Sequence, residues 1–311
     1  MMYAVPASVA AMGIVEVDTH AMLGPLQGRA EIFGHDMQIL RLMLEPGEKV
    51  TAEPGAMVYT HSGVKASCNA DDCCGRCCSG SPCIMATYTG EEPGAYIGLT
   101  PNRPAKVIPL PLEGRTFLAK DRAYFASIGD VTVGYDVDTN PLTCCCGGQG
   151  LIRQKISGQG TAFVGAMGVH ITKHLQPGET ILVDTTSVVA WQDTVKFSVK
   201  KAGSCFTMCC GGEGIFNTSL EGPGQVFIQS YSHGKFKQYA AEWATAKSGG
   251  AGGAAVGVAG LFGGAPVSAD GQEVQAVAAY AVVVEPEDVR RRGLVYAHAA
   301  PANDEMDRKG Q

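Results

Sequence analysis

The sequence has few charged residues and no excess of basic ones. Asp, Glu, Lys and Arg make up 17% of its 311 residues, below the usual quarter, and the net charge is −6 at pH 7. A nucleic-acid partner normally requires a basic face, so none is expected. No window approaches the ~20 apolar residues of a membrane-spanning helix, so no transmembrane segment is expected either.

The N-terminal stretch has no Lys or Arg before Arg29. It therefore has neither the charged start of a secretory signal nor the Arg-rich pattern of a mitochondrial presequence. A cytoplasmic location is the favoured prediction. In that reducing compartment, cysteines persist as thiols or metal ligands more often than as disulfides.

Glycine and cysteine are abundant instead, with 41 and 12 residues. Half of the cysteines lie in the segment CNADDCCGRCCSGSPC, residues 68–83. This density raises four alternatives: a metal site, a redox device, a lipid anchor or a cysteine-decorated turn.

An internal repeat organises the chain. A constant shift of 64 positions carries YFASIGDVTVGYDV (124–137) onto VVAWQDTVKFSV (188–199), and CCGGQGL (145–151) onto CCGGEGI (209–215). A shift of 67 carries Gly47 onto Gly114 and the pair at 77–78 onto the pair at 144–145. The sequence thus predicts three copies of a unit of about 65 residues.

The pattern inside each unit is typical of β-strands. Val131, Val133 and Tyr135 alternate with polar or small residues, as do Val195 and Phe197 in the next unit. Alternation between glycine turns indicates half-buried antiparallel strands. The predicted fold class is all-β, a sandwich or short β-helix with three units related by pseudo-threefold symmetry.

Composition changes suggest the domain boundaries. We predict an N-terminal extension, a β domain with three units, a Gly/Ala-rich linker, and a C-terminal segment with a polar tail. Their bounds are 1–29, 30–240 (units at about 44–100, 110–168 and 174–232), 247–267 and 268–311.

Four segments resemble the signatures of a known family, the altered inheritance of mitochondria protein twenty-four family. They are LEPGEKVTAEPGAMVY (44–59), GGQGLIRQKISGQGTAFV (147–164), LQPGETILVDTTSVVAW (175–191) and GGEGIFNTSLEGPGQVFIQS (211–230). The resemblance covers nearly all of residues 36–232 and implies a threefold-duplicated, TRAP-like β-sandwich. It implies no established activity, and it is the only ground for a mitochondrial location. The cysteines are a departure from the glycine-rich turns of the family.

The cysteines supply the candidate metal ligands. Cys74 and Cys77 have the C-x-x-C spacing of a zinc-binding pair, and the repeat places further pairs in corresponding turns. Convergent turns would bring thiols together for zinc, copper(I) or an iron–sulfur cluster; separated turns would leave only the local set between 68 and 83. The candidate ligands are Cys74, Cys77, Cys78, Cys144, Cys145, Cys209 and Cys210. Unliganded or redox-sensitive turn cysteines are favoured over metal binding, and lipidation ranks last because no basic patch flanks the cluster.

Other polar residues do not form a recognisable catalytic set. His170 and His174 of HITKH lie in a strand context, where four residues advance ~13 Å, so we expect them to be exposed or turn-facing. Glu53 is interpreted as a turn or cross-strand partner rather than a general base. The sequence therefore favours a non-catalytic scaffold or interaction protein with protein partners or self-association, and no cofactor. The alternative is a thiolate metal-binding or redox-sensing protein.

Overall fold

The structure is a computed structural model, and it describes residues 13–69, 82, 84–137, 152–201 and 216–247. These residues belong to the first of two compact units, Met1–Gly257. The second unit, Val258–Gln311, lies outside the described residues, as do the cysteine-rich connections.

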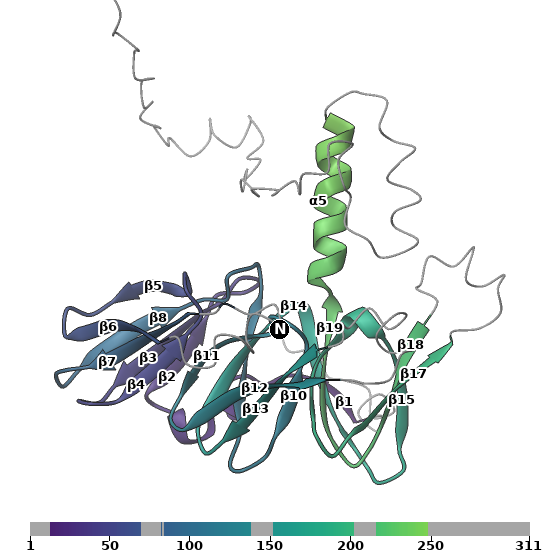
Figure 1. Ribbon diagram of the computed structural model, residues 1–311, viewed down its shortest axis with the longest axis horizontal. Coiled ribbons are helices and arrows are strands. Elements are labelled where there is room, and N and C mark those ends of the chain that lie inside the picture. The colour runs from purple at the N-terminus through teal and green to yellow at the C-terminus, as the bar shows by residue number, and fades with distance from the viewer. Residues whose placement is uncertain (1–12, 70–81, 83, 138–151, 202–215, 248–311) are drawn as a thin grey trace, which may run out of the picture. The chain divides into compact units, whose positions relative to one another are not determined.

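Strands dominate the described chain, which confirms the predicted all-β class (Figure 1). In chain order the elements are β1 (Ile14–Glu16), η1 (Ala21–Leu26), β2 (Ala30–Phe33), β3 (Ile39–Leu44), β4 (Lys49–Ala52), β5 (Met57–Thr60), β6 (Val64–Asn69), β7 (Met85–Gly90), β8 (Ala95–Leu99), β9 (Lys106–Pro111), β10 (Phe117–Ala119), β11 (Tyr124–Ile128), β12 (Val131–Val137), β13 (Ile152–Gly158), β14 (Thr161–Leu175), β15 (Thr180–Asp184), η2 (Thr185–Ser187), β16 (Val188–Gln192), β17 (Lys196–Lys201), β18 (Phe216–Glu221), β19 (Gly224–Tyr231) and α5 (His233–Lys247).

One pairing scheme occurs in three successive groups of six strands. Strand group 1 is β3–β8, strand group 2 is β9–β13 with the first half of β14, and strand group 3 is the second half of β14 with β15–β19. In each group the sixth strand pairs with the first and third, and the fifth pairs with the second and fourth. All of these pairings are antiparallel, as the period-two patterning predicts.

Two junctions join the groups edge to edge. The second strand of group 1, β4, pairs with the third strand of group 2, β11, and β10 pairs with β16 in the same way. The result is a 12-stranded sheet with the main order β12-β13-β10-β16-β19-β14-β11-β4-β7-β6. A four-stranded sheet (β2-β3-β8-β5) and a three-stranded sheet (β15-β18-β17) complete the fold.

Three hydrophobic cores stabilise the fold. Core 1 fills the space between the four-stranded sheet and the 12-stranded sheet, and core 3 lies against the three-stranded sheet. Core 2 combines strands of the 12-stranded sheet with residues of the adjoining segments, such as Val17 and Leu112. Strand β3 shows how the sequence produces this packing, because Leu40, Leu42 and Leu44 are buried and the residues between them are not. Burial of such side chains contributes about 1.5–3 kcal/mol each.

Glycine permits the tight turn between the first and second strands of each group. Gly47, Gly114 and Gly178 have φ values of 84°, 81° and 79°, a region that other residues rarely adopt. They occupy the positions that the shifts of 67 and 64 relate. A shared turn chemistry therefore accompanies the shared pairing scheme.

Helix α5 is the main element that strand patterning did not predict. Its sequence, HGKFKQYAAEWATAK, is rich in Ala and Lys, which favour helices. The Ser232 hydroxyl accepts a hydrogen bond from the backbone N–H of Lys235 and so caps the first turn. Upstream, β1 pairs with β14 and Leu23 of η1 is buried in core 1, so part of the predicted N-terminal extension packs on the body.

Candidate functional site

A row of charged side chains follows the turns between the second and third strands of the three groups. Glu53 follows β4, Lys120 follows β10, and Asp184 ends β15. The backbone ties these turns to the neighbouring group: the Glu53 N–H donates to the Phe125 carbonyl at 2.8 Å, and the Lys120 N–H donates to the Val189 carbonyl at 2.9 Å. The row therefore marks both junctions between groups.

Glu53 lies at the most buried end of this charged row. Only 7% of its surface is exposed, and burial raises its pKa to about 7, against the opposing attraction of Arg103 and Arg122. Burial also raises the pKa of Asp121, which the same two arginines oppose. The pKa of the Arg103 guanidinium is lowered by burial, although both carboxylates favour its charge. Four ionisable groups thus interact with one another between groups 1 and 2.

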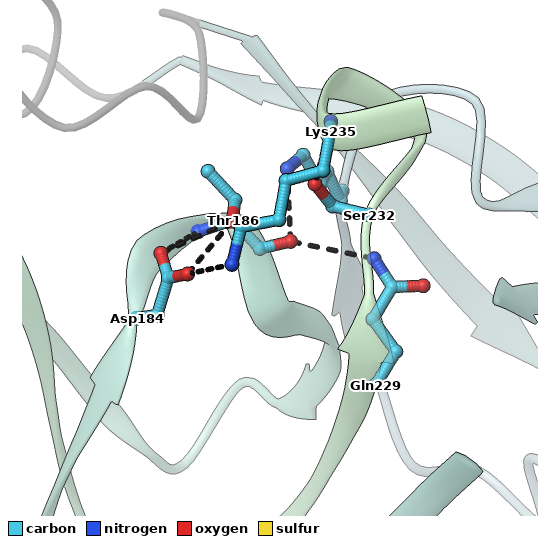
Figure 2. Close-up of polar contacts among 6 residues, drawn as sticks. Asp184, Thr186, Gln229, Ser232 and Lys235 are labelled. Atoms are coloured by element: carbon cyan, nitrogen blue, oxygen red, sulfur yellow. Dashed lines mark hydrogen bonds and ion pairs between the residues drawn. The ribbon is translucent and has the colours of Figure 1, made fainter. Parts of the chain in front are cut away.

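Asp184 organises the other end of the charged row (Figure 2). Its Oδ1 accepts the Thr186 N–H at 2.9 Å, and its Oδ2 lies 2.7 Å from Lys235 Nζ of α5. Burial raises the Asp184 pKa, but the hydrogen bonds from Lys235 and Thr186 outweigh burial and lower it. Two side chains then share the Thr186 carbonyl, since Lys120 Nζ and Gln229 Nε2 donate to it at 3.4 and 3.3 Å. This arrangement attaches the base of α5 to group 3.

His233 begins α5 beside this row. The pKa of its imidazole is lowered to about 4, chiefly by burial and in addition by the positive charges of Lys237, Arg103, Arg122 and Lys120. Perturbed pKa values gather at functional sites but also in structural ion-pair networks. Because its hydrogen bonds cross the group boundaries, we interpret this row as a structural network that holds the three groups and α5 in one arrangement.

The seven predicted cysteine ligands all lie outside the described residues. Cys68, in β6, is described and exposed. In the described ranges no group of three or more His, Cys, Asp or Glu side chains is placed to hold a metal ion.

The strands that flank the cysteine segments do have defined places. The segments join β6 to β7, β12 to β13 and β17 to β18, each an antiparallel pair. The first two hairpins stand at opposite ends of the main strand order of the 12-stranded sheet, and the third belongs to the three-stranded sheet. The connections lie outside the described residues, so convergence of the three turns and a local set between 68 and 83 both stay predictions.

The burial of His170, in the segment HITKH, contradicts one prediction. Both histidines of this segment lie in β14, as the strand context predicted, and His174 is exposed. His170 was expected to be exposed or turn-facing, but only 3% of its surface is accessible. The N-terminal segment lies beside this histidine: β1 pairs with the adjacent residues of β14, and the Val17 N–H donates to the His170 carbonyl. Sequence periodicity within β14 could not reveal a strand added from residues 14–16.

Among the strands that have one edge without a described partner, β5 and β15 differ from their counterparts in the other groups. β5 pairs only with β8 and β15 only with β18, whereas β4, β10, β11 and β16 are paired on both sides. We call these the free edges. They bear exposed apolar side chains, Met57, Val58 and Leu182. Only the pairing pattern distinguishes these strands from their buried counterparts, so residue types alone could not have identified them.

The fold and the charged row define an all-β protein in which successive strand groups join edge to edge. The chain belongs to the family described as mitochondrial biogenesis AIM24, whose model matches residues 30–231. The resemblance predicted from the four sequence segments is thereby confirmed.

Two relatives come from Streptococcus pyogenes. An uncharacterized protein of serotype M6 is 25% identical over 210 residues, which cover 64% of this chain and 83% of that protein. The crystal structure of another protein of this species has a TM-score of 0.56 at 22% identity, over 69% of this chain and 99% of that one. The second likeness concerns the fold alone. Within the described part of the chain, no helix has the length and apolar character to cross a membrane.

Proposed function

We propose that the protein is a non-catalytic scaffold that binds polypeptide chains by accepting their β-strands at the free edges of β5 and β15. The observation that carries the proposal is that β5 and β15 have an edge without a described partner where the corresponding strands of the other groups are paired. The same second and third strands of a group are joined to a neighbouring strand at the two internal junctions, β4 with β11 and β10 with β16. An unpaired edge presents N–H and C=O groups that template a further strand.

The charged row supports a structural rather than a chemical role for the turns beside those edges. Each carboxylate in it faces basic side chains: Asp184 contacts Lys235, and Glu53 and Asp121 are attracted by Arg103 and Arg122. Neutralised networks of this kind hold backbone segments in place. The net charge of −6 supports proteins rather than nucleic acid as partners. A cytoplasmic location remains a prediction from the N-terminal sequence.

A peptide tests strand addition directly. The segment AYFASIGD, residues 123–130, contains β11, which pairs with β4 inside the chain; β15 is the counterpart of β4 in group 3. This peptide, with lysines added for solubility, should bind labelled full-length protein at nanomolar concentration in a saturable way. The Leu182→Lys variant should bind it at least about tenfold more weakly, because the new charge lies on the accepting edge.

The matched control is the same peptide with proline in place of its serine, which removes a backbone donor needed for pairing. Equal binding of both peptides would refute strand addition. So would the absence of saturable binding by the unmodified peptide.

The thiolate alternative leads to a separate prediction. Purified, reduced protein is expected to contain no stoichiometric zinc, copper or iron by elemental mass spectrometry, since turn cysteines are the favoured interpretation. The comparison variant changes Cys77, Cys78, Cys145 and Cys209 to serine. Stoichiometric metal that disappears in this variant would establish a metal site and contradict the prediction.

A further inference from the structure

We propose that copies of this chain join head to tail, with the free edge of β15 in one copy pairing with the free edge of β5 in the next. The inference rests on the proposed strand-binding function and names its partner as a second copy of the chain. Three observations carry it: a shared register, a contrast in burial, and the distribution of charge on the sheet edges.

The two internal junctions have the same register. Ala52 of β4 is opposite Ala126 of β11, and Ala119 of β10 is opposite Ala190 of β16. The shifts of 67 and 64 positions that relate the groups carry 52 onto 119 and 126 onto 190. The two internal junctions therefore have the same pairing geometry.

The same shifts specify the third junction. They place Val183 of one copy opposite Tyr59 of the next, and Leu182 opposite Thr60. The hydrogen bonds from Glu53 N–H to Phe125 and from Lys120 N–H to Val189 then have a third counterpart, from Asp184 N–H to the Val58 carbonyl of the next copy. The proposal thus specifies atoms as well as strands.

Burial separates the free edges from their paired counterparts. Met57 and Val58 of β5 are 41% and 48% exposed, whereas all residues of β11 are buried, and so are Val188 and Val189 at the start of β16. Leu182 of β15 is 62% exposed, while its counterpart Leu118 is half-buried beside core 3. Apolar side chains that the internal junctions cover are left uncovered at the two ends, as expected of an interface.

Charge distinguishes the free edges from the other sheet ends. Natural proteins place charged residues on edge strands to prevent pairing with other chains. The strands at the other sheet ends contain such residues: Glu31 in β2, Lys65 in β6, Asp136 in β12 and Lys196 in β17. β5 has none, and β15 has only its last residue, Asp184, which Lys235 neutralises.

The contact joins two different edges, so it propagates in one direction and closes into a ring or continues as a filament. Light scattering and native mass spectrometry should therefore give the wild-type protein a mass that is a multiple of 32.4 kDa. Leu182→Lys and Thr60→Glu should each raise the dissociation constant at least about tenfold, because each places an uncompensated charge in the junction. The double variant should restore assembly, since the new charges are opposite one another in the proposed register.

The matched control is Met43→Lys, which places lysine on an exposed position of β3, a strand paired on both sides. It should assemble as the wild type does, and circular dichroism should show all four variants folded. A monomeric wild type at high micromolar concentration would overturn the proposal. So would equal dissociation of Met43→Lys, or loss of assembly in Leu182→Lys but not in Thr60→Glu, which would indicate a symmetric contact between two β15 edges.

The peptide experiment distinguishes this inference from the function on which it rests. A monomeric wild type that binds the β11 peptide would leave strand acceptance intact and refute self-assembly. A monomeric wild type that does not bind the peptide would refute both.

Discussion

Replacement of Trp191 with alanine is expected to lower the free energy of unfolding by about 3–5 kcal/mol. The side chain is fully buried in core 3, where its ring stacks on that of Phe197 with the centroids 5.0 Å apart. The buried guanidinium of Arg153 packs over both rings, 5.4 Å from the Trp191 centroid and 4.3 Å from that of Phe197. The substitution therefore creates a cavity and removes part of the surface that holds a buried cation from group 2 against group 3.

Denaturant unfolding followed by circular dichroism measures this loss, and the second tryptophan of the chain supplies the control. Trp243 of α5 is about half exposed, so Trp243→Ala should change stability by no more than about 0.5 kcal/mol. Trp191→Phe should retain the stacking and lose about 1–2 kcal/mol. Equal losses in Trp191→Ala and Trp243→Ala would contradict the packing described for core 3.

Replacement of Glu53 with glutamine should stabilise the protein above neutral pH and flatten its stability profile. Burial raises the pKa of Glu53 from 4.5 to about 7. Between these values the unfolded chain has released the proton and the folded chain retains it, so the free energy of unfolding falls as pH rises through this range. The difference corresponds to about 3 kcal/mol, fully lost above pH 7. Glutamine cannot ionise, so the variant should not show this decline.

His233 provides a control of opposite sign. Its pKa is lowered from 6.5 to about 4, so the folded state favours the neutral imidazole and stability is lost as pH falls through this window. His233→Gln should remove that loss and leave the decline due to Glu53 in place. Chemical unfolding of the two variants at intervals from pH 4 to 8 tests both the loss of stability with rising pH and the loss with falling pH. A Glu53→Gln profile that still falls between pH 4.5 and 7 would refute the assigned role of Glu53.

Much of the strand framework could be predicted from local sequence. Alternation of apolar residues marked strands such as β12 and β17, and glycines at 47, 114 and 178 marked the turns with positive φ. These signals are local, because a strand has a period of two residues and a tight turn needs a residue without a Cβ atom. Four sequence segments also sufficed to predict the family.

The elements that were missed depend on contacts between distant segments. His170 was expected near the surface but is buried, and β1 (residues 14–16) pairs with the adjacent residues of β14. The repeat relates positions 53, 120 and 184, but only the structure shows that the turns at Glu53 and Lys120 bond to the neighbouring groups. The candidate cysteine site lies outside the described residues, and its ligands remain a prediction.

The sequence by itself determined the all-β class, the turns and the family, because these follow from short-range pattern and backbone chemistry. Only the tertiary structure decided which strand edges are paired. β5 and β11 are both apolar strands, and β15 and β10 likewise, yet β11 and β10 are paired on both sides while β5 and β15 have a free edge. Edge pairing depends on where whole strand groups lie, over sequence separations of more than sixty residues, and no local pattern records it.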